Sequence, residues 1–258
     1  MPAMKESIYT TTGRGYPFFF QHGLGSDRVQ PQGLLSGLEG IQLISMDSRG
    51  HGSSPFTGID DISFDRYADD VIDLATHLNI NQAYVGGISM GAGIALNIAL
   101  RYPHFAKALV LVRPAWLDQE FPENLKLMAG MADFMKKNEP ESFQRTPEFL
   151  AWQRKEPLTT ASLLAHTKSN LPDYAAELIH KMWSDRPMKH LTDLQKVQVP
   201  ALVLVSHRDF LHPYAYGITL MRSLPQAHLV EIPSRYEDNG GYERAVRLEV
   251  KRFLEKIV

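Results

Sequence analysis

The hydrophobic pattern alternates between short apolar runs and longer amphipathic stretches. The apolar runs predict strands at residues 18–20, 41–46, 83–87 and 109–112. The stretch 64–78 has helical spacing, and 92–100 is typical of a helix of small residues. Short continuous apolar strands separated by helices are typical of a parallel sheet covered on both faces. The pattern therefore predicts an α/β fold.

The pattern changes between residues 117 and 191. This stretch contains helical segments and no convincing strand, and Leu127 and Met131 lie on one face of its first helix. The alternation then resumes with elements expected at 199–205, 214–224, 228–232 and 242–257. We therefore predict a core formed by 1–116 and 192–258, with 117–191 inserted as a helical cap. The methionines of this cap either pack onto the core or line a substrate pocket.

Composition mainly excludes classes of function. A formal net charge of −2 gives no reason to expect nucleic acid or an anionic membrane as partner. The absence of cysteine excludes disulfides, thiolate catalysis and Cys-ligated zinc. No signal peptide and no bilayer-spanning apolar run is recognised, so we expect a cytoplasmic location. No metal-ligand motif is present either, and we expect neither a metal ion nor a cofactor.

The strongest chemical signal is the sequence G-x-S-x-G at residues 87–91, between an apolar strand and a small-residue helix. Such a turn needs glycines because the backbone bends sharply and neighbouring elements lie close. It exposes the hydroxyl of Ser89, and the following helix N-terminus favours developing negative charge. A nucleotide loop is not indicated: Ala92 stands where a P-loop needs lysine, and Leu96 where the dinucleotide fingerprint needs a small residue.

Four segments together resemble the α/β-hydrolase superfamily: His22-Gly23, Asp47-x-Arg49-Gly50-x-Gly52-x-Ser54, Gly87-x-Ser89-x-Gly91 and a late strand ending at Asp209. The resemblance covers nearly the whole chain and implies that fold with a helical cap, but this fold hosts many reactions. It implies that Ser89 is the nucleophile and Asp209 the catalytic acid. It also implies an oxyanion hole made by the backbone N–H groups of Leu24 and Met90.

The catalytic histidine departs from the family pattern. In the family it lies after the last strand, but residues 233–241 contain no histidine. None follows His228, which begins that strand and should lie at the wrong end of the sheet. His212 is the best substitute because it shares a loop with Asp209, and His207 is a weaker candidate. Alternatively, Asp209 only caps the next helix, and His212 has a structural or substrate-binding role.

Three residues are candidates for contact with substrate. His22 either holds the oxyanion turn or touches the substrate. Arg113 and Trp116 follow a strand at the point where the cap begins. The planar guanidinium of Arg113 suits a substrate carboxylate or phosphate, although a role in anchoring the cap explains its position equally well.

We therefore predict a serine hydrolase that cleaves a small ester, thioester or amide through an acyl-enzyme on Ser89. The missing loop histidine favours a second hypothesis, a ligand-binding or regulatory protein of reduced catalytic activity. The third hypothesis is a lyase-type acid–base enzyme that uses the same pocket. The expected partner is a small-molecule substrate. The short region before Phe18 leaves a sheet edge that a second copy could cover, so a homo-oligomer stays open.

Overall fold

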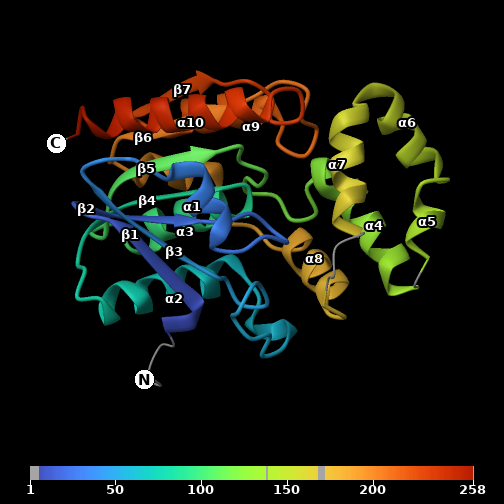
Figure 1. Cartoon of the computed structure of the whole chain (residues 1–258), viewed down its shortest axis with the longest axis horizontal. Helices are drawn as coiled ribbons and strands as arrows, with labels where there is room; N and C mark the ends of the chain where they lie inside the picture. Colours follow the sequence, from blue (N-terminus) through green and yellow to red (C-terminus); the bar gives the residue numbers. More distant parts are fainter. Residues whose placement is uncertain (1–5, 138, 168–171, 258) are drawn as a thin grey trace.

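A seven-stranded sheet forms the centre of the computed structural model, which describes residues 6–137, 139–167 and 172–257 (Figure 1). The strands follow the order β1-β3-β2-β4-β5-β6-β7. Only β1 is antiparallel to its neighbour, and the other five pairs are parallel, which confirms the predicted fold class. The strand bounds are Tyr9–Gly13 (β1), Tyr16–Gln21 (β2), Ile41–Met46 (β3), Ala83–Ile88 (β4), Ala106–Val112 (β5), Ala201–Val205 (β6) and Ala227–Glu231 (β7).

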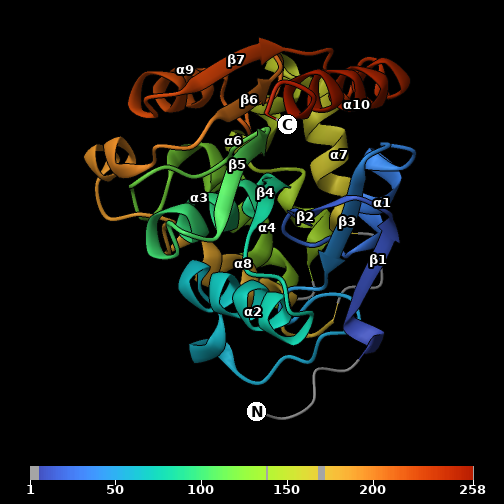
Figure 2. The same cartoon turned by 90° about the vertical axis from the view of Figure 1, so that its left-hand side faces the viewer.

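Helices cover both faces of this sheet (Figure 2). On one face lie α2 (Phe64–His77), α3 (Met90–Arg101) and α9 (Tyr214–Ser223), and on the other α1 (Val29–Leu35) and α10 (Asn239–Leu254). The side chains of β2 show why both faces are apolar. Phe19 packs with α2 and α3, whereas Phe18 and Phe20 pack with α1 and α10, because successive strand residues point to opposite faces.

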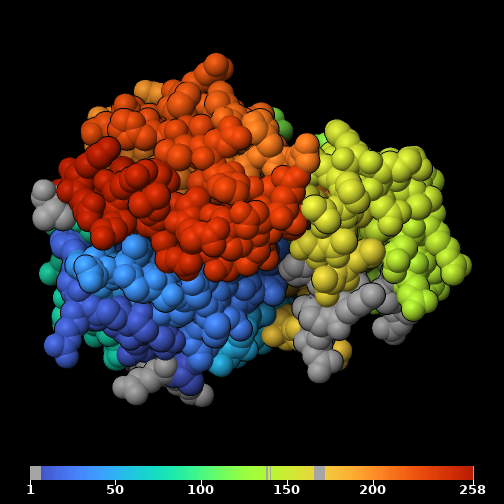
Figure 3. All heavy atoms as spheres, turned by 45° about the horizontal axis from the view of Figure 1, so that its top comes forward, coloured from blue at the N-terminus to red at the C-terminus, as the bar shows by residue number. Residues whose placement is uncertain are grey.

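The insert between β5 and β6 forms a helical lobe beside the core (Figures 1 and 3). Its helices are α4 (Lys126–Lys136), α5 (Pro140–Phe143), α6 (Pro147–Lys155), α7 (Pro157–Thr167) and α8 (Ala175–Trp183). Four 3₁₀ helices complete the described elements: Glu6–Ile8, Ile59–Asp61, Glu123–Leu125 and Leu191–Lys196. The described part of 117–191 contains no strand, as expected for the cap, whose boundaries stay a prediction. None of the described helices is both long and apolar enough to cross a membrane.

Two elements of the core are absent from the sequence prediction. β1 lies at the sheet edge before Phe18, where we expected little room for a strand; its three threonines give no apolar signal. α1 contains Pro31 and Gly33, which interrupt the helical pattern, although Leu34 and Leu35 are buried. The homo-oligomer expected from a bare edge stays a prediction.

Candidate active site

Ser89 lies on a sharp turn between β4 and α3. Its φ of 58° and ψ of −114° place a non-glycine residue in a strained region of backbone space. The flanking glycines allow this turn. A Cβ on Gly87 would lie 2.2 Å from the carbonyl carbon of Gly91, and a Cβ on Gly91 would lie 2.2 Å from the carbonyl oxygen of Gln21. The motif therefore positions Ser89 through backbone contacts that only glycine permits.

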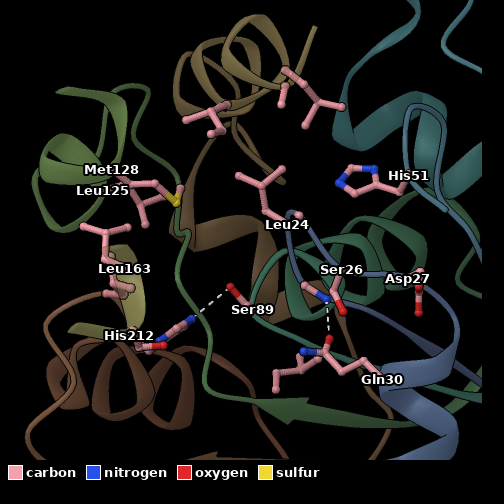
Figure 4. Close-up of a pocket in the computed structure, with 18 of the residues that line it drawn as sticks. Leu24, Ser26, Asp27, Gln30, His51, Ser89, Leu125, Met128, Leu163 and His212 are labelled. Carbon is pink, nitrogen blue, oxygen red and sulfur yellow. Dashed lines mark hydrogen bonds between the residues drawn. The ribbon is translucent and has the colours of Figure 1, made fainter. Parts of the chain in front are cut away.

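Ser89, His212 and Asp209 form a hydrogen-bonded chain, and Figure 4 shows its bond between Ser89 and His212. The Ser89 Oγ lies 2.9 Å from His212 Nε2, and His212 Nδ1 lies 2.9 Å from Asp209 Oδ1. Asp209 and His212 belong to one turn between β6 and α9, closed by a bond of 3.1 Å from the His212 N–H to the Asp209 carbonyl. Both side chains are buried. The structure thus brings together the three residues predicted to be catalytic.

Arg113 lies beside this chain, in contact with both Asp209 and His212. It follows β5 with a φ of 48°, and its guanidinium is buried. Its Nε and Nη2 lie 2.7 and 2.6 Å from Asp209 Oδ2, and Nη2 also donates to the Tyr236 hydroxyl at 2.8 Å. Of the two roles predicted for Arg113, substrate binding or a structural role, these internal partners favour the structural one. The residue that they hold is Asp209 rather than the cap.

The same ion pair sets the charges of the site. Burial opposes ionisation of Asp209, but Arg113 and His212 outweigh it and hold the pKa of this carboxyl well below its usual range. Burial and then Arg113 lower the pKa of His212, and Asp209 offsets this only in part. His212 is therefore neutral at pH 7, the state in which an imidazole can accept a proton.

Two tautomers of His212 compete at Nδ1. Arg113 Nη2 lies 3.0 Å from this nitrogen, close to the distances from Asp209. If Nδ1 carries the proton, it donates to Asp209 and leaves Nε2 free to accept from the Ser89 hydroxyl. If Nε2 carries the proton, Nδ1 accepts from Arg113 and the base function is lost. Action of His212 as a base would need the first tautomer, which the carboxylate of Asp209 favours.

The turn at His22-Gly23-Leu24 packs directly on the elbow. A Cβ on Gly23 would lie 3.4 Å from the Ser89 Cβ. His22 is fully buried: its Nδ1–H donates to the Gly23 carbonyl at 2.8 Å, and its Nε2 accepts from the Ser48 N–H at 3.0 Å. Burial lowers its pKa to about 4. Of its two predicted roles, the structure supports holding the turn; His22 does not line the cavity at Ser89.

The predicted oxyanion donors lie at this contact. Met90 is the first residue of α3, where a helix leaves its N–H groups unpaired. Among the described residues, no protein acceptor is recorded for the N–H of Leu24 or Met90. The neighbouring Gly23 N–H donates to Gln30 Oε1 at 2.8 Å, which fixes the turn. Leu24 and Met90 stay the predicted donors.

Comparison with known proteins agrees with this geometry. A family model described as alpha/beta hydrolase fold matches residues 16–208. The chain belongs to the α/β-hydrolase family.

Several relatives of this α/β-hydrolase chain are named hydrolases. It is 26% identical over 239 residues to AB hydrolase superfamily protein YisY of Bacillus subtilis (strain 168), covering 84% of this chain and 83% of that protein. It is 23% identical over 219 residues to Lipase 3 of Moraxella sp. (strain TA144), covering 84% and 70%. The enol-lactonase from Burkholderia xenovorans LB400 superposes with a TM-score of 0.72 at 22% identity over 96% of this chain and 95% of that one, which shows the fold alone.

In this α/β hydrolase a cavity of about 770 Å³ opens beside Ser89 and His212. Its apolar wall comes largely from the cap: Leu125, Met128, Met131, Leu163, Leu178 and Ile179. Trp116 also lines the cavity, but it is almost fully buried, and its indole N–H donates to the Met182 carbonyl at 3.0 Å. The structure therefore fixes Trp116 as part of the wall. Met128 and Met131 line the cavity and also pack with the hydrophobic core, so both alternatives for the cap methionines hold for these two residues.

The core side of the cavity contains residues that sequence reasoning missed. Gln30, Arg235 and Tyr236 line it. Nothing in the sequence marks Gln30, because its role depends on a turn seven residues away. Arg235 and Tyr236 lie in the loop 233–241, where the family pattern places a histidine. This loop does line the cavity, but an arginine and a tyrosine there gave no sequence signal of a functional role. Among the described residues, no three His, Asp or Glu side chains are grouped closely enough to hold a metal ion.

Proposed function

We propose that this chain is a serine hydrolase that cleaves a small ester, thioester or amide through an acyl-enzyme on Ser89. The contact of 2.9 Å between Ser89 Oγ and His212 Nε2 is the observation that carries the proposal. An imidazole at this distance can take the hydroxyl proton, and Asp209 stabilises the imidazolium that results. The hydrolase names among the relatives support the same class of reaction.

The proposed reaction has two steps. Ser89 Oγ bonds to the substrate carbonyl carbon while its proton passes to His212 Nε2. The bond to the leaving alcohol, thiol or amine then breaks, and that group takes the proton from His212. In the second step a water molecule attacks the acyl carbon and gives a proton to His212, which returns it to Ser89 as the acid product leaves. The N–H groups of Leu24 and Met90 would stabilise the oxyanion in both steps.

Arg113 favours a second candidate, a catalytically reduced protein that binds a ligand in the same cavity. A buried cation 3.0 Å from His212 Nδ1 opposes the imidazolium that must form during acylation. Arg113 also competes with Asp209 for the hydrogen bond to His212 Nδ1, which decides which tautomer forms. A reduced enzyme would keep the elbow and the cavity but acylate slowly.

Labelling with a fluorophosphonate probe, followed by intact mass spectrometry, separates the two candidates. We expect rapid addition of one probe to the wild type, and no addition to Ser89→Ala. His212→Ala should slow the reaction strongly, because the hydroxyl loses its base. Labelling of the wild type no faster than of Ser89→Ala would reject the hydrolase in favour of the binding protein.

A further inference from the structure

The charged residues that line the cavity differ in how they are paired. They are Asp27, Arg113 and Arg235. Arg113 is neutralised by Asp209 within the protein. Asp27 accepts the Val29 N–H at 2.8 Å and lies on the Gln30 side of Ser89, away from His212 (Figure 4). Arg235 is thus the cation among the described lining residues that no carboxylate neutralises.

Arg235 is a half-buried cation without a protein anion. Among the described residues, no carboxylate lies within 4.0 Å of it, and its guanidinium makes no recorded hydrogen bond. Its recorded contact is with the ring of Tyr236, whose centre lies 5.7 Å from the guanidinium carbon. A contact with the face of a ring leaves the N–H groups of a guanidinium available to a ligand, because it uses none of them as hydrogen-bond donors.

The loop that carries Arg235 is ordered and close to the catalytic residues. The Ser234 carbonyl accepts the N–H groups of Glu237 at 3.1 Å and Asp238 at 2.9 Å, forming a turn. Tyr236 in turn bonds to Arg113, which holds Asp209. Arg235 also contributes to lowering the pKa of His212, after burial and Arg113. Arg235, Tyr236 and His212 all line the cavity, so the cation belongs to the same cavity as the proposed base.

We propose that Arg235 binds an anionic group of the substrate, a carboxylate or a phosphate, while the apolar wall holds the remainder. This inference rests on the proposed function, since it places the scissile carbonyl at Ser89. A planar guanidinium suits either anion through paired N–H···O bonds. A partly desolvated cation also gains more from an anionic ligand than it would in bulk water. The substrate class is then an amphiphilic, anionic ester or related acyl compound.

Matched esters test this specificity. We would compare 4-nitrophenyl butyrate with 4-nitrophenyl hydrogen glutarate, whose charge lies on the acyl half. Ethyl butyrate would be compared with 3-butyryloxypropanoate and with butyryloxyethyl phosphate, whose charges lie on the alcohol half. We expect the wild type to favour an anionic ester of at least one set. Arg235→Gln should reduce the ratio of kcat/KM for that anionic ester to kcat/KM for its neutral partner about tenfold.

The ratio of the two kcat/KM values is the readout because a general effect of the substitution, on folding or on catalysis, lowers both values and cancels in the ratio. Arg244→Gln is the matched control, since Arg244 is exposed on α10 and does not line the cavity. It should leave the ratio unchanged, and Arg235→Lys should retain part of it. Equal losses for neutral and anionic esters in Arg235→Gln would overturn the proposal, as would a wild type without anionic preference in any set. The set that responds shows whether the anion lies on the acyl or the alcohol half, and the ester that responds shows whether it is a carboxylate or a phosphate.

Calorimetry with Ser89→Ala separates this inference from the proposed function. Butyrate and butyl phosphate are the anionic probes, and butyramide is the neutral one. Tighter binding of an anion, lost on adding Arg235→Gln, would support the anion site even if the wild type failed to react with a fluorophosphonate. Rapid labelling of Ser89 without any anion preference in binding would leave the hydrolase standing and remove the anion site.

Discussion

At the residue scale, the site differs from the family pattern in the position of its histidine, which follows β6 instead of the last strand, β7. Asp209 and His212 are three positions apart on one turn, and His212 still reaches Ser89 Oγ at 2.9 Å. The loop after the last strand supplies Tyr236, which bonds to Arg113, which in turn bonds to Asp209. The residues at the usual histidine position thus support the acid, and the proposed base has moved to the acid's own loop.

Replacing His212 tests this arrangement directly. We expect His212→Asn to lower kcat/KM for 4-nitrophenyl butyrate by about 10³-fold or more, because Ser89 loses its proton acceptor. His207→Asn is the control, since His207 is exposed and stacks on Tyr214 outside the cavity. If both variants kept wild-type activity, His212 would not be the base.

The pH dependence of kcat/KM reports the state of His212. Burial and Arg113 lower its pKa from the ordinary 6.5, so the neutral, active form persists into mildly acidic buffer. We expect a plateau at pH 7 and above, with the acid limb centred below 6.5. The profile would be measured from pH 5 to 8.5, with circular dichroism at each pH to confirm folding. An acid limb centred at or above 7 would contradict the assigned environment.

At the element scale, the cap holds the loop that carries Asp209 and His212 as well as lining the cavity. Three cap side chains bond to the backbone of residues 208–211. Glu156 accepts the Phe210 N–H at 2.8 Å, Thr159 donates to the Arg208 carbonyl at 3.0 Å, and Asn124 donates to the Leu211 carbonyl at 2.7 Å. The orientation of Asp209 and His212 therefore depends on the docking of the cap.

Glu156 offers the sharpest test of this dependence. Glu156→Ala removes a charged acceptor from the Phe210 N–H, and we expect kcat to fall about three- to thirtyfold with a smaller change in KM. The fluorophosphonate labelling rate should fall in parallel, which a loss of substrate contact alone would not cause. Glu148→Ala, exposed on α6, is the control. Unchanged labelling in Glu156→Ala would show that the loop keeps its geometry without the cap.

The elements predicted correctly have strong local patterns, and those missed depend on distant partners. The prediction for 41–46 matches β3, and that for 64–78 matches α2 to within one residue, because apolar spacing alone defines them. β1 needs β3 as its partner, and its threonines look like a loop in isolation. In the site, the motif locates Ser89, but the pairing of Arg113 with Asp209 joins residues 96 positions apart, which no local pattern records.

At the scale of the whole molecule, two buried histidines link stability to pH. The rings of His22 and His51 lie 4.9 Å apart, and His51 belongs to the loop that follows β3. Burial lowers the pKa of His22 to about 4 and, with a smaller effect of His22, that of His51 to about 3. Both imidazoles are neutral in the folded state above these values, whereas in the unfolded chain they titrate near 6.5.

The free energy of unfolding should therefore fall as the pH drops below 6.5. Between about pH 6.5 and 4 the two histidines bind protons in the unfolded chain but stay neutral in the folded core. Each histidine therefore lowers the free energy of unfolding by up to about 1.4 kcal/mol per unit decrease in pH. Asp70 and Asp185 act in the opposite direction, because burial raises their pKa values. Comparison with His22→Asn isolates one histidine.

Urea unfolding at pH 7.5, 6.0 and 5.0 measures the effect. The free energy of unfolding of the wild type should fall over this range. Its slope against pH should be steeper than that of His22→Asn by an amount equivalent to at most one bound proton. His77→Asn provides the control for an exposed histidine, since it removes an imidazole from the surface end of α2. Equal slopes in the wild type and His22→Asn would mean that His22 binds protons as readily in the folded state as in the unfolded chain. Below about pH 6.5 it could not then accept the Ser48 N–H, and the turn under Ser89 would need another support there.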